Sequence, residues 1–336
     1  MPDLEARCKA LVLELGLGRS EEVSDVVPLT GGVASDIARF TLNGRILCAK
    51  FALEKLKVAE DWRAPVHRNS AEYSWLQFAT SVAPENGVPL YGQSKRLNGF
   101  VMDFIGGEGA YLWKAAMLAE APDRGEAAKV ADLLGRLQLA STEPGFDASD
   151  FRNQDDFFAL RIEPYLTFTA SVHDDLKAPL LELANMLFNA QGVLVHGDVS
   201  PKNILIRPSG PVLLDAECAT LGDASFDPAF CMNHLILKAV HLPNSRDRLL
   251  SNVNAFWEAY NQHISFERPD EVEKRVSRLL PALMLARVDG KSPVEYLSAE
   301  GQRTVRDLSR DLIRKPVDRI ADLVDRVRKG AAYNAL

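Results

Sequence analysis

Hydrophobic and polar positions follow one pattern before about residue 105 and another after it. Before it, short apolar runs are bounded by turn pairs such as Asn43-Gly44, which predicts strands and hairpins, and helical spacing recurs in 4–17 and 68–80. After it, apolar residues three or four positions apart dominate, in 127–137, 157–166, 180–187 and, broken at Pro316, in 303–329. The pattern predicts an α+β fold of two lobes, one strand-rich and N-terminal, the other mainly helical and C-terminal.

Three short β-type runs interrupt the helical half, and polar residues stand at their ends. Asp198 and Asn203 lie between the runs 193–195 and 204–206, and Asp215 follows the run 211–214. A carboxylate, an amide five residues later and a second carboxylate past a short hairpin are the groups that present a base and two magnesium ligands to a nucleotide. Clusters of Asp, Pro and Asn are also ordinary turn chemistry, which is the alternative.

His196-Gly197-Asp198 followed by Asn203, with Asp215 in Leu-Leu-Asp-Ala-Glu, resembles the catalytic loop and metal-binding segment of the aminoglycoside phosphotransferase and choline kinase family. The stretch after Lys50 is similar to methylthioribose kinase. This resemblance implies a protein-kinase-like fold in which Asp198 orients the acceptor hydroxyl and accepts its proton, while Asn203 and Asp215 hold Mg²⁺. Glu217 would assist the metal directly or through water, and a solvated carboxylate is the alternative.

A fold of this kind needs a lysine on a strand and a glutamate on the following helix. Lys50 is the lysine of the apolar run 45–51, and Glu72 lies in the next predicted helix, which Asn69 or Ser70 would cap. Lys50 is expected to bind the nucleotide phosphates and Glu72 to orient it.

The remaining nucleotide contacts are expected from backbone. The chain has neither a G-x-G-x-x-G loop nor a Walker sequence, but Gly31, Gly32 and Ser35 stand where the resemblance implies a shorter phosphate-binding turn. The Asp103 carbonyl and the Ile105 amide would pair with the adenine edge.

These placements imply a domain organisation. Residues 1–105 would form the nucleotide-binding lobe, with a hinge near 102–107, and 106–336 the helical lobe. The helical lobe would carry the catalytic loop 196–203 and the metal-binding segment 212–217. Downstream, Asp227 before Pro228 predicts a helix N-cap that supports the loop.

Composition is that of an ordinary enzyme of 336 residues, with 47% hydrophobic and 25% charged residues and a formal net charge of -7. An acidic total argues against nucleic-acid or anionic-membrane partners. Four scattered cysteines indicate neither a disulfide scaffold nor a zinc site, and no apolar run approaches a membrane span. With no export signal at the N-terminus, a cytoplasmic location is expected.

The predicted function is transfer of the ATP γ-phosphoryl group, with Mg²⁺, to a hydroxyl of a small molecule such as a sugar, an amino alcohol or an aminoglycoside-like compound. One alternative is a pseudokinase that binds nucleotide without turnover. A remote one is a non-haem iron oxygenase using His196, Asp198 and a later histidine, His234, His241 or His263. The polar stretch 287–293 predicts a turn, with a contribution to acceptor binding as its alternative.

Overall fold

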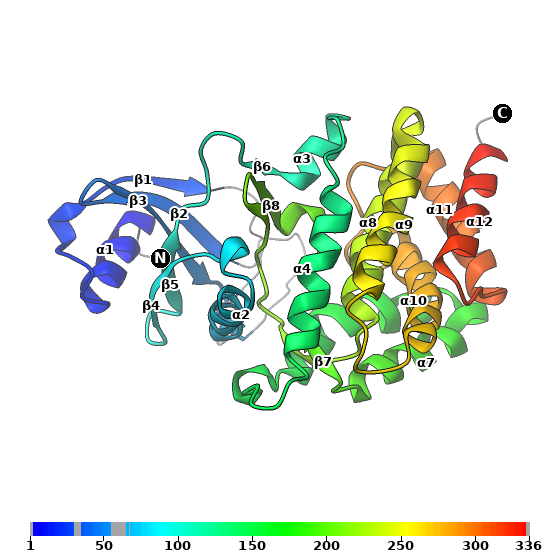
Figure 1. The fold of residues 1–336 in the computed structure, drawn as a ribbon, viewed down its shortest axis with the longest axis horizontal. Coiled ribbons are helices and arrows are strands. Elements are labelled where there is room, and N and C mark those ends of the chain that lie inside the picture. The colour runs from blue at the N-terminus through cyan, green and yellow to red at the C-terminus, as the bar shows by residue number, and fades with distance from the viewer. Residues whose placement is uncertain (1–2, 30–34, 55–64, 67, 334–336) are drawn as a thin grey trace.

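The computed structural model describes residues 3–29, 35–54, 65–66 and 68–333, so Gly31 and Gly32 lie outside the described residues. Its N-terminal part is a five-stranded antiparallel sheet in the order β1-β2-β3-β5-β4 (Figure 1). The strands are β1 Val23–Leu29, β2 Ser35–Leu42, β3 Arg45–Ala52, β4 Leu90–Ser94 and β5 Gly99–Asp103. The predicted strand-rich N-terminal lobe is therefore present.

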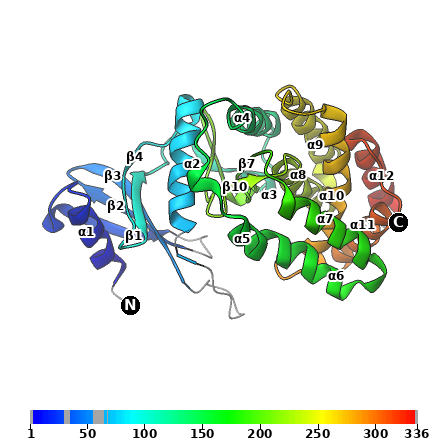
Figure 2. The ribbon, with the colours of Figure 1, turned by 90° about the horizontal axis from the view of Figure 1, so that it is seen from below.

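One helix covers each face of this sheet, α1 Leu4–Glu14 and α2 Arg68–Val82 (Figure 2). Successive side chains of a strand point to opposite faces. In β3, Leu47, Ala49 and Phe51 accordingly pack in the core beneath α1, whereas Cys48 joins the core of α2. Lys50 is two residues after Cys48, so its side chain lies on the same face of the sheet and points toward α2.

The C-terminal part is mainly helical, as predicted, and lies at the other end of the long axis (Figure 1). Helix α4 packs against α9, and α8 lies between α9 and α10. The helices of this part are α3 Trp113–Leu118, α4 Glu126–Ala140, α5 Gln154–Phe157, α6 Phe168–Val172, α7 Lys177–Asn189, α8 Phe226–His241, α9 Arg246–Asn261, α10 Pro269–Asp289, α11 Ala299–Arg314 and α12 Ile320–Tyr333.

Two small sheets hold the polar loops of the helical part. One pairs β7 Val193–Val195 with β10 Thr220–Gly222. The other joins β6 Tyr111–Leu112, β8 Ile204–Arg207 and β9 Gly210–Leu213 in the order β6-β8-β9. The segments that follow β7 and β9 meet at Asn203, whose carbonyl accepts the backbone N–H of Leu214 and whose side chain donates to the Asp198 carbonyl.

Some local predictions were wrong. Asn69 and Ser70 do not cap α2, because the helix begins at Arg68 and both residues lie in its first turn. The Asn69 side chain is buried there, and the Ser70 hydroxyl accepts a hydrogen bond from Gln93 at 2.9 Å. The helical stretch 157–166 is wound as a π-helix over Phe158–Thr167, with Pro164, which has no N–H to donate, inside it.

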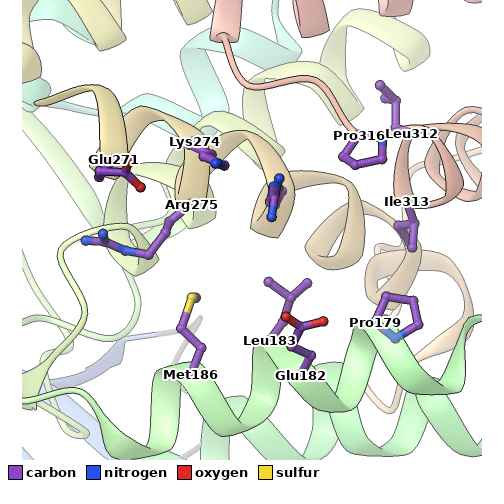
Figure 3. Close-up of a pocket in the computed structure, with 11 residues that line it drawn as sticks. Pro179, Glu182, Leu183, Met186, Glu271, Lys274, Arg275, Leu312, Ile313 and Pro316 are labelled. Atoms are coloured by element: carbon purple, nitrogen blue, oxygen red, sulfur yellow. The ribbon is translucent and has the colours of Figure 1, made fainter.

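The amphipathic C-terminal stretch was predicted correctly, since α11 ends at Arg314 and α12 begins after Pro316. Between α7, α10 and α11 lies a pocket of about 450 Å³, with Glu182, Lys274 and Leu312 among its lining residues (Figure 3). None of the residues lining it is a predicted site residue. Among the described helices, none is long and apolar enough to cross a membrane.

Candidate active site

The loop after β7 is shaped by Gly197. Its φ of +84° lies in the left-handed region, and a Cβ there would meet the Cys218 sulfur at 2.7 Å. Only glycine meets both conditions without strain. The loop then passes through a 3₁₀ turn at Pro201–Asn203, where the backbone N–H of Asn203 donates to the Ser200 carbonyl at 2.8 Å.

Asp227 fixes this loop from α8. Its two carboxylate oxygens accept the backbone N–H of His196 at 2.7 Å and of Gly197 at 2.9 Å, and Gln138 donates to it at 3.3 Å. Burial raises the pKa of Asp227 to about 7, against the opposing effect of those amides. The predicted N-cap role is wrong, because α8 begins at Phe226 after Ser225. The predicted support of the loop is present.

We expect Asp227→Asn to lower the free energy of unfolding by about 1–3 kcal/mol, because one loop amide then faces an NH₂ group and loses its acceptor. Urea denaturation followed by circular dichroism measures this. Asp132→Asn is the control, since Asp132 is exposed and pairs with the surface residues His263 and Arg136. Equal stability of the two variants would contradict the anchoring role.

Asp198 is buried among cations. Arg161, from the π-helix, donates to Asp198 Oδ2 at 2.9 Å and also to the Gly197 carbonyl, and Lys202 Nζ lies 3.4 Å from the same Oδ2. Burial alone would raise the pKa of Asp198, but Lys202 and Arg161 outweigh it and hold that pKa well below its ordinary value. The carboxylate is therefore ionised at every physiological pH.

Asn203 and Asp215 are joined through the hairpin β8–β9. The Leu214 amide donates to the Asn203 carbonyl at 2.9 Å, and Asn203 Nδ2 donates to the Asp198 carbonyl at 3.2 Å. Asp215 has a φ of +71°, a conformation that is unfavourable for a residue with a Cβ and that concentrates at functional sites.

Lys50 links the sheet to this hairpin. Its Nζ lies 2.6 Å from Glu72 Oε2 and also contacts Asp215 Oδ1, and the Asp215 amide donates to Glu72 Oε1 at 3.1 Å. Lys50 is 3% exposed and Glu72 1%, so little water reaches this ion pair, whereas the Asp215 side chain is partly exposed. Burial lowers the pKa of Lys50, but Asp215 and Glu72 raise it above its ordinary value. The predicted lysine–glutamate pair is present.

Glu217 is not solvated; it is 6% exposed and pairs with Arg68, whose Nε lies 2.8 Å from its Oε2. Arg68 also donates to the carbonyls of Pro65 and Leu53, both at 2.7 Å. The solvated alternative was therefore wrong. The pair ties the start of α2 to the segment after β9.

The segment expected to bind adenine follows β5. The Asp103 side chain is not part of it, since it accepts from Tyr91 at 2.8 Å and pairs with Arg45 at 3.1 Å within the sheet. Ile105 is half-buried in the connection to β6, where Gly107 has a φ of +102°. Ser35, the first residue of β2, is buried.

The iron alternative is not supported. His196 is buried, its ring packs edge-on against Trp75 at 4.6 Å, and its Nδ1 accepts the Asp198 amide at 3.1 Å. Burial lowers the pKa of His196 to about 4, so the ring is neutral. In the part of the chain that the structure describes, no group of three or more His, Cys, Asp or Glu residues could hold a metal ion.

Sequence reasoning missed Arg161 and Arg68. Both are long cationic side chains that the fold buries beside carboxylates, as buried charges ordinarily are. The signal for Arg161 was its place between Leu160 and Ile162 in an apolar helical run. Nothing comparable marks Arg68 in the sequence.

The model of the phosphotransferase enzyme family matches residues 28–241 of the chain. This match covers more than half of the 336 residues, and the chain belongs to that family. The family predicted from the catalytic loop is thus confirmed. No curated protein matches the sequence.

Several solved structures share the fold. Ethanolamine kinase from Plasmodium vivax is 11% identical, with a TM-score of 0.56 over 98% of this chain and 88% of that chain. A choline/ethanolamine kinase family protein from Mesorhizobium loti is 16% identical, with a TM-score of 0.53 over 98% and 93%. Amicoumacin kinase, in complex with AMP-PNP, Ca²⁺ and Ami, is 13% identical, with a TM-score of 0.54 over 95% and 98%. At these identities the likeness shows the fold, which is the two-lobed, protein-kinase-like one.

Proposed function

We propose that this protein transfers the γ-phosphoryl group of ATP, with Mg²⁺, to a hydroxyl of a small molecule. The observation that carries the proposal is the meeting of Lys50, Glu72 and Asp215 beside Asp198 and Asn203. A lysine held between a helix carboxylate and a hairpin carboxylate is placed to receive phosphate oxygens. Membership of the phosphotransferase family and the fold shared with small-molecule kinases support it.

The oxygen donors suit magnesium. Mg²⁺ prefers one or two protein oxygens together with nucleotide phosphates, and Asp215 and Asn203 offer a carboxylate and an amide oxygen at neighbouring ends of one hairpin. When bound, the ion would neutralise charge on the transferring phosphoryl group. Glu217 would act beside them through water, or by holding Arg68. The presence of Ca²⁺ with AMP-PNP in the amicoumacin kinase complex supports the use of a divalent cation with the nucleotide.

The chain's own groups then have separate tasks. Residues 1–105 would bind nucleotide, with Lys50 on the phosphates, Gly31, Gly32 and Ser35 near them, and the Asp103 carbonyl and Ile105 amide at the adenine. The acceptor oxygen forms a bond to the γ-phosphorus while the bond to the bridging oxygen breaks and ADP leaves. The acceptor proton passes to Asp198, which is too weak a base to activate the hydroxyl early and so acts by orientation and late transfer.

A thermal-shift titration with ATP tests this function together with an ADP-release assay across hydroxylated metabolites. We expect ATP to raise Tm only when Mg²⁺ is present, and EDTA to abolish both the shift and ADP release. Stabilisation by ATP without ADP release from any acceptor would favour the pseudokinase. No stabilisation by nucleotide would contradict the proposal.

A further inference from the structure

Three basic side chains of α8 and α10 lie in the interior of the helical lobe, and we call His234, Lys238 and Arg287 the basic cluster. His234 and Lys238 are one turn apart on the same face of α8, and they are 6% and 1% exposed. Arg287 is half-buried in the last turn of α10, which packs against α8 (Figure 1).

The basic cluster has no acidic counterpart. In the described part of the chain, no carboxylate pairs with Lys238 or Arg287, although buried cations are ordinarily paired. Lys238 Nζ lies over the ring of Tyr296, 4.9 Å from its centre. Arg287 Nε and the Tyr296 hydroxyl are buried without any hydrogen-bond partner. Arg287 Nη1 already donates to the Ser292 carbonyl and, at 2.9 Å, to the Ser292 hydroxyl. Among the described residues, Arg287 Nε and the Tyr296 hydroxyl are therefore the two donors here that lack an acceptor.

Arg287 is connected to the catalytic loop through Tyr165. Arg287 Nη1 donates to the Tyr165 hydroxyl at 3.1 Å. Tyr165 is one turn beyond Arg161 on the π-helix, and Arg161 holds Asp198. The cluster thus lies on the helical-lobe side of Asp198.

His234 and Lys238 are connected to the loop along α8. The Tyr165 ring packs on Phe230 with centres 5.4 Å apart, and Phe230 packs on His234 at 5.5 Å. Asp227, which holds the catalytic loop, is on the same face of α8 as His234 and Lys238. Helix side chains lean toward the N-terminus, so Lys238 extends toward that loop.

An unpaired ammonium in the interior is costly, and a fold retains it where something bound there compensates it. Burial, with Lys114 and Arg287 nearby, lowers the pKa of Lys238 to about 7. An anion would supply the missing acceptor, whereas a cationic acceptor would add to the repulsion. Glu295, a carboxylate that acts on Lys238, is exposed and already paired with Lys114 at 2.5 Å.

We propose that the phosphoryl acceptor is an anion, a hydroxylated small molecule whose carboxylate or phosphate group binds Lys238 and Arg287 while its hydroxyl reaches Asp198. This inference rests on the proposed function and narrows its substrate class. It replaces the sugar, amino alcohol and aminoglycoside-like acceptors expected from the sequence with acidic ones. Arg287 lies in α10 and not in the predicted turn, and the inference gives it the alternative role, a contribution to acceptor binding.

An ADP-release screen with three matched sets of acceptors tests the inference. The sets are hydroxy acids, sugar phosphates and uncharged or cationic alcohols, each measured with the wild-type enzyme, Lys238→Met and Arg287→Gln. We expect turnover with one of the two acidic sets, which identifies the anionic group, and at least a tenfold higher KM for that acceptor in both variants. The KM for ATP should change far less. Lys129→Met is the control, because Lys129 is exposed on α4 and donates a hydrogen bond to the Arg124 carbonyl.

ADP release confined to uncharged or cationic alcohols would overturn the inference while leaving the proposed function standing. Unchanged acceptor KM in both variants would overturn it too. Absence of ATP binding and of ADP release with every acceptor would instead contradict the proposed function.

Stability gives a second readout that does not depend on activity. Lys238→Met should raise Tm, and more at pH 6 than at pH 9, because the folded-state amine is charged below about pH 7 and its burial is then most costly. The charged and titratable groups around it are Lys114, Arg287, Glu295, Tyr296, Cys231, His234 and His241. No gain at either pH would show that the amine is already compensated and would overturn the premise.

Discussion

Asp198→Asn is expected to lower kcat by about 10²–10⁴-fold while ATP still raises Tm in the presence of Mg²⁺. The asparagine keeps the shape of the side chain and one oxygen that can orient a hydroxyl. It cannot take a proton, because an amide is not basic in the physiological range. Acceptor KM and Mg²⁺ dependence should change much less than kcat, since neither depends on proton transfer.

The surroundings of Asp198 sharpen this expectation. Lys202 and Arg161 keep its carboxylate ionised, so the wild-type rate should show no acid limb from this group above about pH 4. The same cations lose their counter-charge in the variant, and Tm must be measured to separate a lost proton acceptor from a loosened loop.

Asp175→Asn is the matched control. Asp175 is also bridged to two cations, Arg310 at 2.8 Å and Arg314, but it lies on the surface before α7. We expect wild-type kcat for it. An Asp198→Asn enzyme with full kcat would refute the assignment of Asp198, and equal losses in both variants would point to a general effect of removing a bridging carboxylate.

The Lys50–Glu72 pair could be predicted because the family resemblance implies a lysine on a strand and a glutamate on the following helix. Side chains of β3 alternate between the two faces of the sheet, so Lys50 lies with Cys48 on the face where α2 packs. The helix after the strand supplies Glu72. The order of elements along the chain therefore sufficed. The lobes, the catalytic loop and the hairpin that carries Asp215 were predictable for the same reason, since each depends on neighbouring residues.

Tertiary partners could not be found in this way. Arg161 contacts Asp198 from 37 positions away and Arg68 contacts Glu217 from 149, and no local pattern encodes such pairs. The N-cap role predicted for Asp227 was wrong because its partners are distant in the sequence. Asp before Pro favours an N-cap locally, but the carboxylate is taken by the amides of His196 and Gly197. Burial likewise changed Glu217 from a candidate solvated acid into the partner of Arg68.

Asp215→Asn is expected to lower kcat on the order of a thousandfold and to shift the Mg²⁺ requirement to higher concentration. Metal stabilisation of the transferring phosphoryl group is worth several kcal/mol, and each 1.36 kcal/mol is tenfold in rate. A neutral amide binds Mg²⁺ more weakly than a carboxylate, so ATP should raise Tm less than in the wild type. Lys50 also loses one of its two carboxylate partners, which leaves Glu72 as its anchor.

The comparison between Asp215→Asn and Asp198→Asn isolates the metal role. If Asp215 is a ligand, raising Mg²⁺ should restore part of the activity of Asp215→Asn and none of that of Asp198→Asn, because excess ion refills a weakened site but replaces no proton acceptor. Mg²⁺ titrations of kcat and of the ATP-induced rise in Tm measure both. A Mg²⁺ requirement identical to the wild type in Asp215→Asn would exclude Asp215 as a ligand, and its carboxylate would then serve mainly to hold Lys50 in place.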